Sequence, residues 1–106
     1  MKKSLLALFL IGFVCVASAA EDSVYDVFKK NGCFVCHSNE KKVVGPAYKD
    51  VAEKYRRDPS AEDKLVEKVS KGGSGVWGSM AMPAQDPKGI KQAEIRRLVQ
   101  YVLRLQ

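Results

Sequence analysis

The sequence predicts a small, single-domain, all-α fold. Apolar residues recur at helical spacing in several segments, no segment alternates apolar and polar residues over a useful length, and no repeat or low-complexity stretch divides the chain. A chain of 106 residues buries only a small core, so a staple such as a metal, a disulfide or a cofactor is expected.

The N-terminus has the layout of a secretory signal peptide. Lys2 and Lys3 precede an apolar run over residues 5–16, and small residues follow at positions 17–20. This run is too short to cross roughly 30 Å of hydrocarbon as a permanent helix.

We therefore expect residues 1–20 to be a cleaved signal peptide and residues 21–106 to form the mature domain in the periplasm, with no integral membrane segment. Cleavage before Ala20 also fits the small-residue rule. Lipid attachment through Cys15 is disfavoured, because Val14 is a bulky residue where lipoprotein signals have a small one.

Helical periodicity and turn residues predict four helices after the leader. Ser60, with Asp63 three residues later, resembles a capping box, so its hydroxyl is expected to cap the third helix. The expected helices are one over 23–30 stopped by Asn31-Gly32, one starting at Pro46 and broken at Asp58-Pro59, one after Ser60 ending at Gly72-Gly73, and a C-terminal one marked by Ile95, Leu98, Val99, Val102 and Leu103.

Residues 72–89 are expected to form an irregular loop, because they contain five glycines and two prolines. Loops of this length are usually functional or disordered. This one carries Trp77, Met80 and Met82, which are poor choices for disorder, so something is expected to pack against it.

The run Cys33-Phe34-Val35-Cys36-His37 is typical of a c-type haem attachment site in an exported protein. Two thiols separated by two residues reach two vinyl groups of one haem, and the following imidazole faces the iron. The alternatives are a disulfide, a zinc half-site or a thioredoxin-like redox pair. Zinc needs further thiols or imidazoles, and the redox pair needs a preceding strand where a helix is expected here.

A second protein ligand to the iron would be methionine, because His37 is the sole histidine of the chain. A neutral thioether favours ferrous iron and raises the reduction potential. The spacing of Met80 and Met82 does not decide between them. Pro83 favours Met82, because it holds that residue in extended backbone, and Gln85 lies where its amide could reach the sulfur.

Trp77 and Pro46 each have two interpretations. Trp77 is either a core aromatic residue or a wall of the haem pocket whose indole N–H bonds a propionate, and the glycine-rich context favours the second. Pro46 starts a helix, or its carbonyl accepts a hydrogen bond from the proximal imidazole. From the residues alone, the helix start is the better supported.

The formal net charge of +6 falls modestly when Lys2 and Lys3 leave with the signal peptide. Such a charge suits steering toward an acidic patch on a protein partner more than wrapping a nucleic acid. We expect no nucleic-acid partner, and a monomer that meets other redox proteins.

These motifs resemble those of the bacterial class I cytochromes of the cytochrome c-551 type. The resemblance spans essentially the whole mature chain and is carried by the haem motif 32–37, the segment Val-Gly-Pro-Ala-Tyr-Lys-Asp-Val-Ala at 44–52, the glycine-rich segment 71–78 and the pair Met82-Pro83. It implies a class I cytochrome c fold of four to five helices around one covalent haem c per chain.

The resemblance also implies residue roles. They are thioethers at Cys33 and Cys36, axial ligation by His37 and Met82, a histidine hydrogen bond to the Pro46 carbonyl, and Trp77 near a propionate. It further implies a periplasmic electron carrier of the respiratory chain that serves terminal oxidases, nitrite reductase or other acceptors and donors.

An enzyme or gas sensor would use the same haem motif but would need a distal acid-base group, and the sequence has no second histidine. Outer-sphere electron transfer needs only a six-coordinate iron and an exposed haem edge. We therefore expect an electron-transfer protein with no enzymatic activity.

Overall fold

The computed structural model describes residue 12 and residues 17–106. The predicted apolar leader core and Cys15 lie outside the described residues. Within the described part, no helix is long and apolar enough to cross a membrane. The elements in chain order are α1 (Ala17–Lys30), a 3₁₀ turn η1 (Cys33–Val35), α2 (Tyr48–Tyr55), α3 (Ala61–Lys71), β1 (Gly73–Gly75), β2 (Gly78–Met82) and α4 (Gln92–Leu103).

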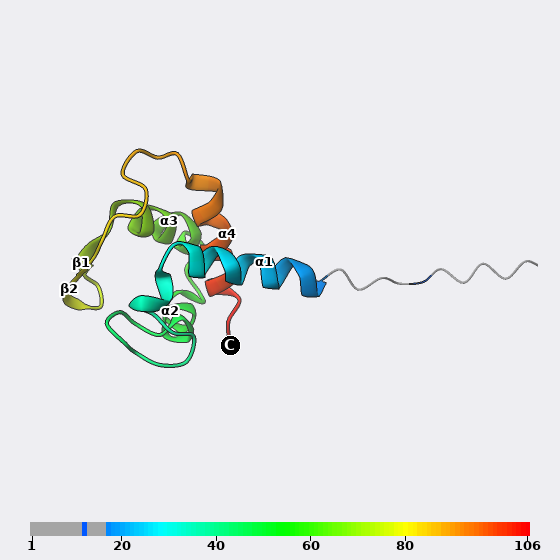
Figure 1. Ribbon diagram of the computed structural model, residues 1–106. Coiled ribbons are helices and arrows are strands. Elements are labelled where there is room, and N and C mark those ends of the chain that lie inside the picture. The colour runs from blue at the N-terminus through cyan, green and yellow to red at the C-terminus, as the bar shows by residue number, and fades with distance from the viewer. Residues whose placement is uncertain (1–11, 13–16) are drawn as a thin grey trace, which may run out of the picture.

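The C-terminal helix α4 organises the core, because it packs against α1, α2 and α3. In Figure 1, α1 and α4 cross, and the β1–β2 hairpin lies on the far side of the molecule from the start of α1. Aromatic rings fill the centre, where Phe28 contacts Phe34, Tyr48 and Tyr101. The buried cluster comprises Val24, Phe28, Tyr48, Val51, Leu65, Val66, Ile95, Leu98, Val99 and Val102.

Helix α1 ends where the sequence predicts and begins earlier. Gly32 has φ 69°, a left-handed conformation that favours glycine and stops the helix. Asn31 then ties this end to α4, because its Nδ2 donates to the Val27 carbonyl at 2.8 Å and to Glu94 Oε1 at 2.9 Å. The expected start at Ser23 was wrong, since the helical backbone already begins at Ala17.

The prediction that residues 72–89 are wholly irregular was also wrong. β1 and β2 pair antiparallel, with Gly73 opposite Met82 and Gly75 opposite Gly78. All three glycines have φ between 112° and 115°, a region that other residues rarely adopt. The hairpin rests on glycine backbone, so the sequence shows no alternating side-chain pattern that could predict it.

Two predicted helix starts differ from the structure. Pro46 lies outside α2, which begins at Tyr48 after Ala47. Ser60 does precede α3, but its side chain makes no capping bond to the helix. Its backbone, with φ −98° and ψ 7°, is not in the extended conformation of a side-chain cap, and its hydroxyl donates to Asp58 Oδ1 at 2.7 Å.

Asp58 is therefore the anchor before α3. It also accepts from the Ser60 amide at 2.9 Å and from Lys64 Nζ at 2.7 Å. These bonds, first from Lys64 and then from Ser60, lower the pKa of Asp58 to about 2.

Candidate functional site

An apolar cavity of about 1120 Å³, including its open mouth, lies between two stretches of the chain. One wall comes from the segment around η1 and the start of α2, and the other from α3, the hairpin and Pro83. Leu98, Val99 and Val102 of α4 also line it. The cavity is thus built from helices at both ends of the domain.

The η1 turn brings the haem motif to the first wall. The amides of Cys36 and His37 both donate to the Cys33 carbonyl, at 3.2 and 3.0 Å. Cys33 and Cys36 both line the cavity together with His37. Burial raises the pKa of the Cys33 thiol as it stands before any thioether bond is made.

The imidazole of His37 is held in one orientation. Its Nδ1 lies 2.8 Å from the Pro46 carbonyl oxygen. A carbonyl only accepts, so Nδ1 carries a proton, and in the neutral ring the lone pair is then on Nε2. The Tyr48 ring stacks on the imidazole, with centroids 4.9 Å apart and planes 17° apart. Pro46 therefore serves as the acceptor, and not as the first residue of a helix.

Gly45 completes this arrangement, a role the sequence analysis did not predict. A Cβ at position 45 would lie 2.5 Å from Cε1 and 2.9 Å from Nδ1 of His37. The amides of Val44 and Gly45 both donate to the Cys36 carbonyl, at 3.2 and 2.7 Å, which fixes this strip of backbone against the ring. Only glycine fits between them.

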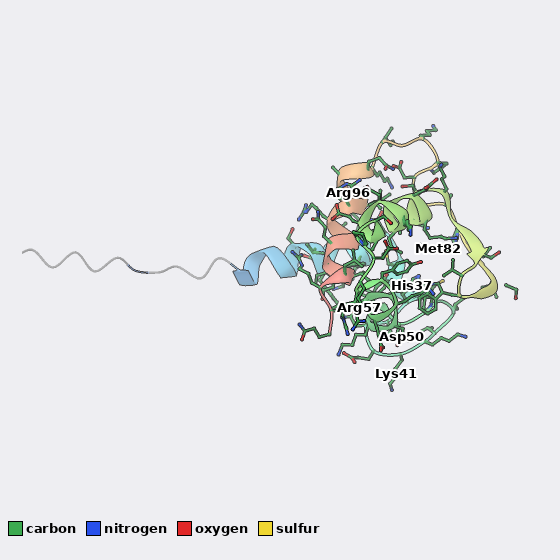
Figure 2. All side chains as sticks on the ribbon, turned by 180° about the vertical axis from the view of Figure 1, so that it is seen from behind. His37, Lys41, Asp50, Arg57, Met82 and Arg96 are labelled. Atoms are coloured by element: carbon green, nitrogen blue, oxygen red, sulfur yellow. The ribbon has the colours of Figure 1, made fainter. Side chains whose placement is uncertain are left out.

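Met82 lies on the second wall, at the end of β2. It is half-buried, whereas Met80 is 70% exposed, although both border the cavity. Figure 2 shows Met82 and His37 together on the side of the molecule away from the start of α1. Gly72, with φ 70°, lets the end of α3 approach the Met82 backbone, because a Cβ there would collide with the Met82 carbonyl oxygen.

The Gln85 side chain makes no hydrogen bond to the Met82 sulfur, contrary to the expectation from the sequence. Its Nε2 donates to the Pro83 carbonyl at 3.0 Å. The nearby backbone acceptor competes successfully for the amide.

Trp77 lines the cavity near the hairpin tip and is 41% exposed, so it is a wall residue and not a core residue. Two lysines that the sequence analysis did not single out lie close by. The Lys54 ammonium lies 5.7 Å from the Trp77 ring centroid, and Lys68 lines the cavity itself. Cations at a cavity mouth could have been found only from the fold, because basic residues occur throughout the sequence.

Known proteins are similar to this chain in sequence and in fold. Residues 23–106 match the cytochrome c family. The chain is 52% identical to cytochrome c-551 of Allochromatium vinosum over 77 residues, covering 73% of this chain and 80% of that protein. It is 44% identical to cytochrome c-552 of Hydrogenobacter thermophilus over 103 residues, 97% of each chain. The crystal structure of Nitrosomonas europaea cytochrome c552 superposes with a TM-score of 0.71 at 41% identity, covering 77% of this chain and 99% of that one.

The four α-helices of residues 17–106 pack beside the apolar cavity as in a small class I cytochrome fold. The chain belongs to the cytochrome c family. Its cofactor is one covalently attached haem c, and it is an electron-transfer protein. The predicted fold class, cofactor and general function are thereby confirmed.

The residues of the cavity fit this cofactor. The lining is mostly apolar, as a porphyrin face requires. Nδ1 of His37 bonds the Pro46 carbonyl oxygen, which leaves Nε2 as the nitrogen that could bind the iron. The cradle that Gly45 leaves beside the ring would be filled by any other side chain.

Proposed function

We propose that this protein is a periplasmic carrier of single electrons, which accepts them from respiratory-chain donors and delivers them to terminal oxidases, nitrite reductase or similar acceptors. The haem is held by thioethers at Cys33 and Cys36, and its iron by His37 and Met82. The observation that carries the proposal is the presence of His37, with Nδ1 bonded to Pro46, and Met82 on two walls of one apolar cavity.

Each residue has a distinct task. When bound, the haem iron takes up and releases one electron. The Pro46 carbonyl increases the basicity of His37 by accepting a hydrogen bond from its Nδ1–H. Met82 supplies a soft, neutral sulfur, which favours the reduced state. The apolar lining excludes water, so a change of iron charge requires little solvent reorganisation.

The rim of the cavity supports exchange at the haem edge. Val44, Val76 and Trp77 line the cavity and are also exposed, so the cofactor edge lies near the surface. Trp77 and Lys68 are the side chains we assign to the propionates. Lys68, Lys54 and the positive net charge suit a docking partner with an acidic patch. We further propose that the protein is monomeric and has no nucleic-acid partner.

Carbon monoxide distinguishes this carrier from an enzyme or gas sensor. With both axial positions filled, ferric and ferrous forms should be six-coordinate and low-spin, and the reduced protein should bind little carbon monoxide at neutral pH. Visible spectra of the oxidised and reduced protein, with and without the gas, measure this. Rapid and complete binding would favour a sensor or enzyme instead.

The mass of the exported protein tests the proposed processing and haem attachment. We expect residues 21–106 plus one haem that acid-acetone fails to extract. Cleavage before Ala20 would add one alanine and keep the proposal. A mass without haem, with Cys33 and Cys36 joined as a disulfide, would contradict it.

A further inference from the structure

Asp86 is a buried carboxylate that the haem chemistry does not use. It is 4% exposed, and every other residue from 72 to 93 is half-buried or exposed. Its Oδ1 accepts from the Ile90 amide at 2.9 Å, and its Oδ2 accepts from the Lys91 amide and from Gln92 Nε2, both at 2.9 Å. Asp86 thereby closes the loop that leads into α4, whose N-cap residue Lys91 makes no side-chain capping bond.

The same carboxylate is tied to the last turns of α3. Its backbone amide donates to the Ser70 carbonyl at 3.1 Å. Gln92 Nε2, which bonds Asp86, also donates to Ser70 Oγ at 2.8 Å, and Ser70 Oγ donates to the Val66 carbonyl at 2.7 Å. Ser70 is itself buried. Asp86 therefore joins α3 to the start of α4.

The Met82 segment is attached to α3 at two points. At Met82 itself, the carbonyl oxygen lies against Gly72, the residue that follows α3. Downstream of Met82, the backbone amide of Gln85 donates to the Val69 carbonyl at 3.0 Å, and Asp86 is the next residue. We propose that Asp86 is a positioning residue for Met82, which fixes the downstream end of the methionine-bearing segment so that the sulfur stays directed at the iron. This inference rests on the proposed ligation by Met82.

The charge of Asp86 favours this role. Burial opposes its ionisation, but the hydrogen bonds from Gln92, Lys91 and Ile90 outweigh that effect and hold the pKa of Asp86 below its usual range. Lys91 adds a favourable charge, and the other groups facing it, Ser70 of α3 and Gln92 of α4, are neutral. The ionised carboxylate thus stabilises the fold above about pH 4, and this contribution is lost as the pH falls through the lowered pKa.

The test compares two matched substitutions in the haem-loaded protein. Asp86→Asn keeps the volume but turns an amide N–H₂ toward groups that donate. Asp58→Asn makes the same change at another carboxylate that precedes a helix, remote from Met82 in the chain. The readouts are Tm and the alkaline pH at which the ferric sulfur-to-iron charge-transfer band is lost.

We expect Asp86→Asn to lower the pH midpoint for loss of the band by about one unit. This shift is equivalent to a roughly tenfold smaller equilibrium constant for the bond between the Met82 sulfur and the iron. Asp58→Asn should lower Tm without moving that midpoint. The difference in Tm between the unsubstituted protein and Asp86→Asn should also shrink below about pH 4. Gln92→Ala removes the bonds from Gln92 to Ser70 and to Asp86 but leaves the carboxylate with its two backbone donors. It should shift the midpoint in the same direction if Asp86→Asn fails to take up haem.

Equal losses of Tm in both aspartate variants, with neither midpoint moved, would overturn the positioning role and leave Met82 ligation intact. An unshifted midpoint in Gln92→Ala, in the case where Asp86→Asn takes up no haem, would overturn it as well. Absence of the band in the unsubstituted protein would overturn the ligation itself, and this inference with it.

Discussion

Replacing Met82 with alanine is expected to abolish the ferric sulfur-to-iron charge-transfer band and to lower the reduction potential sharply. Axial ligands set haem potentials over about 0.8 V, and loss of a neutral sulfur removes the ligand that favours ferrous iron. Visible spectroscopy and redox titration of the purified protein measure both effects.

Met80→Leu is the matched control for this substitution. Met80 is also on β2 and borders the cavity, but it is 70% exposed and precedes no proline. The band and the potential should therefore stay close to those of the unsubstituted protein. If Met80→Leu alone removes the band, the two methionines must exchange roles.

Gly45→Ala is expected to disrupt haem binding although it adds one methyl group. The new Cβ would lie 2.5 Å from Cε1 of His37, so the ring must turn and its bond to the Pro46 carbonyl must lengthen or break. Overpacking of this kind costs about 1–3 kcal/mol of stability. We expect a lower Tm, a reduced yield of haem-loaded protein and a loss of low-spin character in its spectrum.

Pro46→Ala serves as the control for Gly45→Ala. The substitution keeps the carbonyl that accepts the hydrogen bond from Nδ1–H and adds no atom beside the imidazole, so the low-spin spectrum should persist. A normal spectrum and Tm in Gly45→Ala would show that the backbone moves aside at little cost, and that the close packing does not hold the ring.

The sequence predicted those features that side chains encode. The helical spacing of Ile95, Leu98, Val99 and Val102 became the buried face of α4. The haem motif and Met82 stood out in the sequence because few residues of these types occur, and the structure brings Cys33, Cys36, His37 and Met82 to one cavity.

Features that depend on the backbone could not be predicted in the same way. The β1–β2 hairpin is made by glycines at positive φ, which leave no side-chain pattern. The Pro46 carbonyl was expected as an acceptor from the family resemblance, whereas the residues alone favoured a helix start, because the bond depends on how the chain folds back on Cys36. Asp86 bonds Ile90 and Gln92, which follow it in the sequence, and Gln92 in turn bonds Ser70, which precedes it. No local sequence motif joins these residues.

The helical core and the segment that carries Met82 differ in how many buried contacts stabilise them. Phe28 and its aromatic neighbours belong to a helical core with many buried contacts, whereas from residue 72 to 93 only Asp86 is buried. Segments with few buried contacts open at a lower free energy than the whole domain. The proposed sulfur ligand therefore belongs to the weaker cooperative unit and His37 packs against the stronger, so partial opening would release one side of the iron while the helices stay folded.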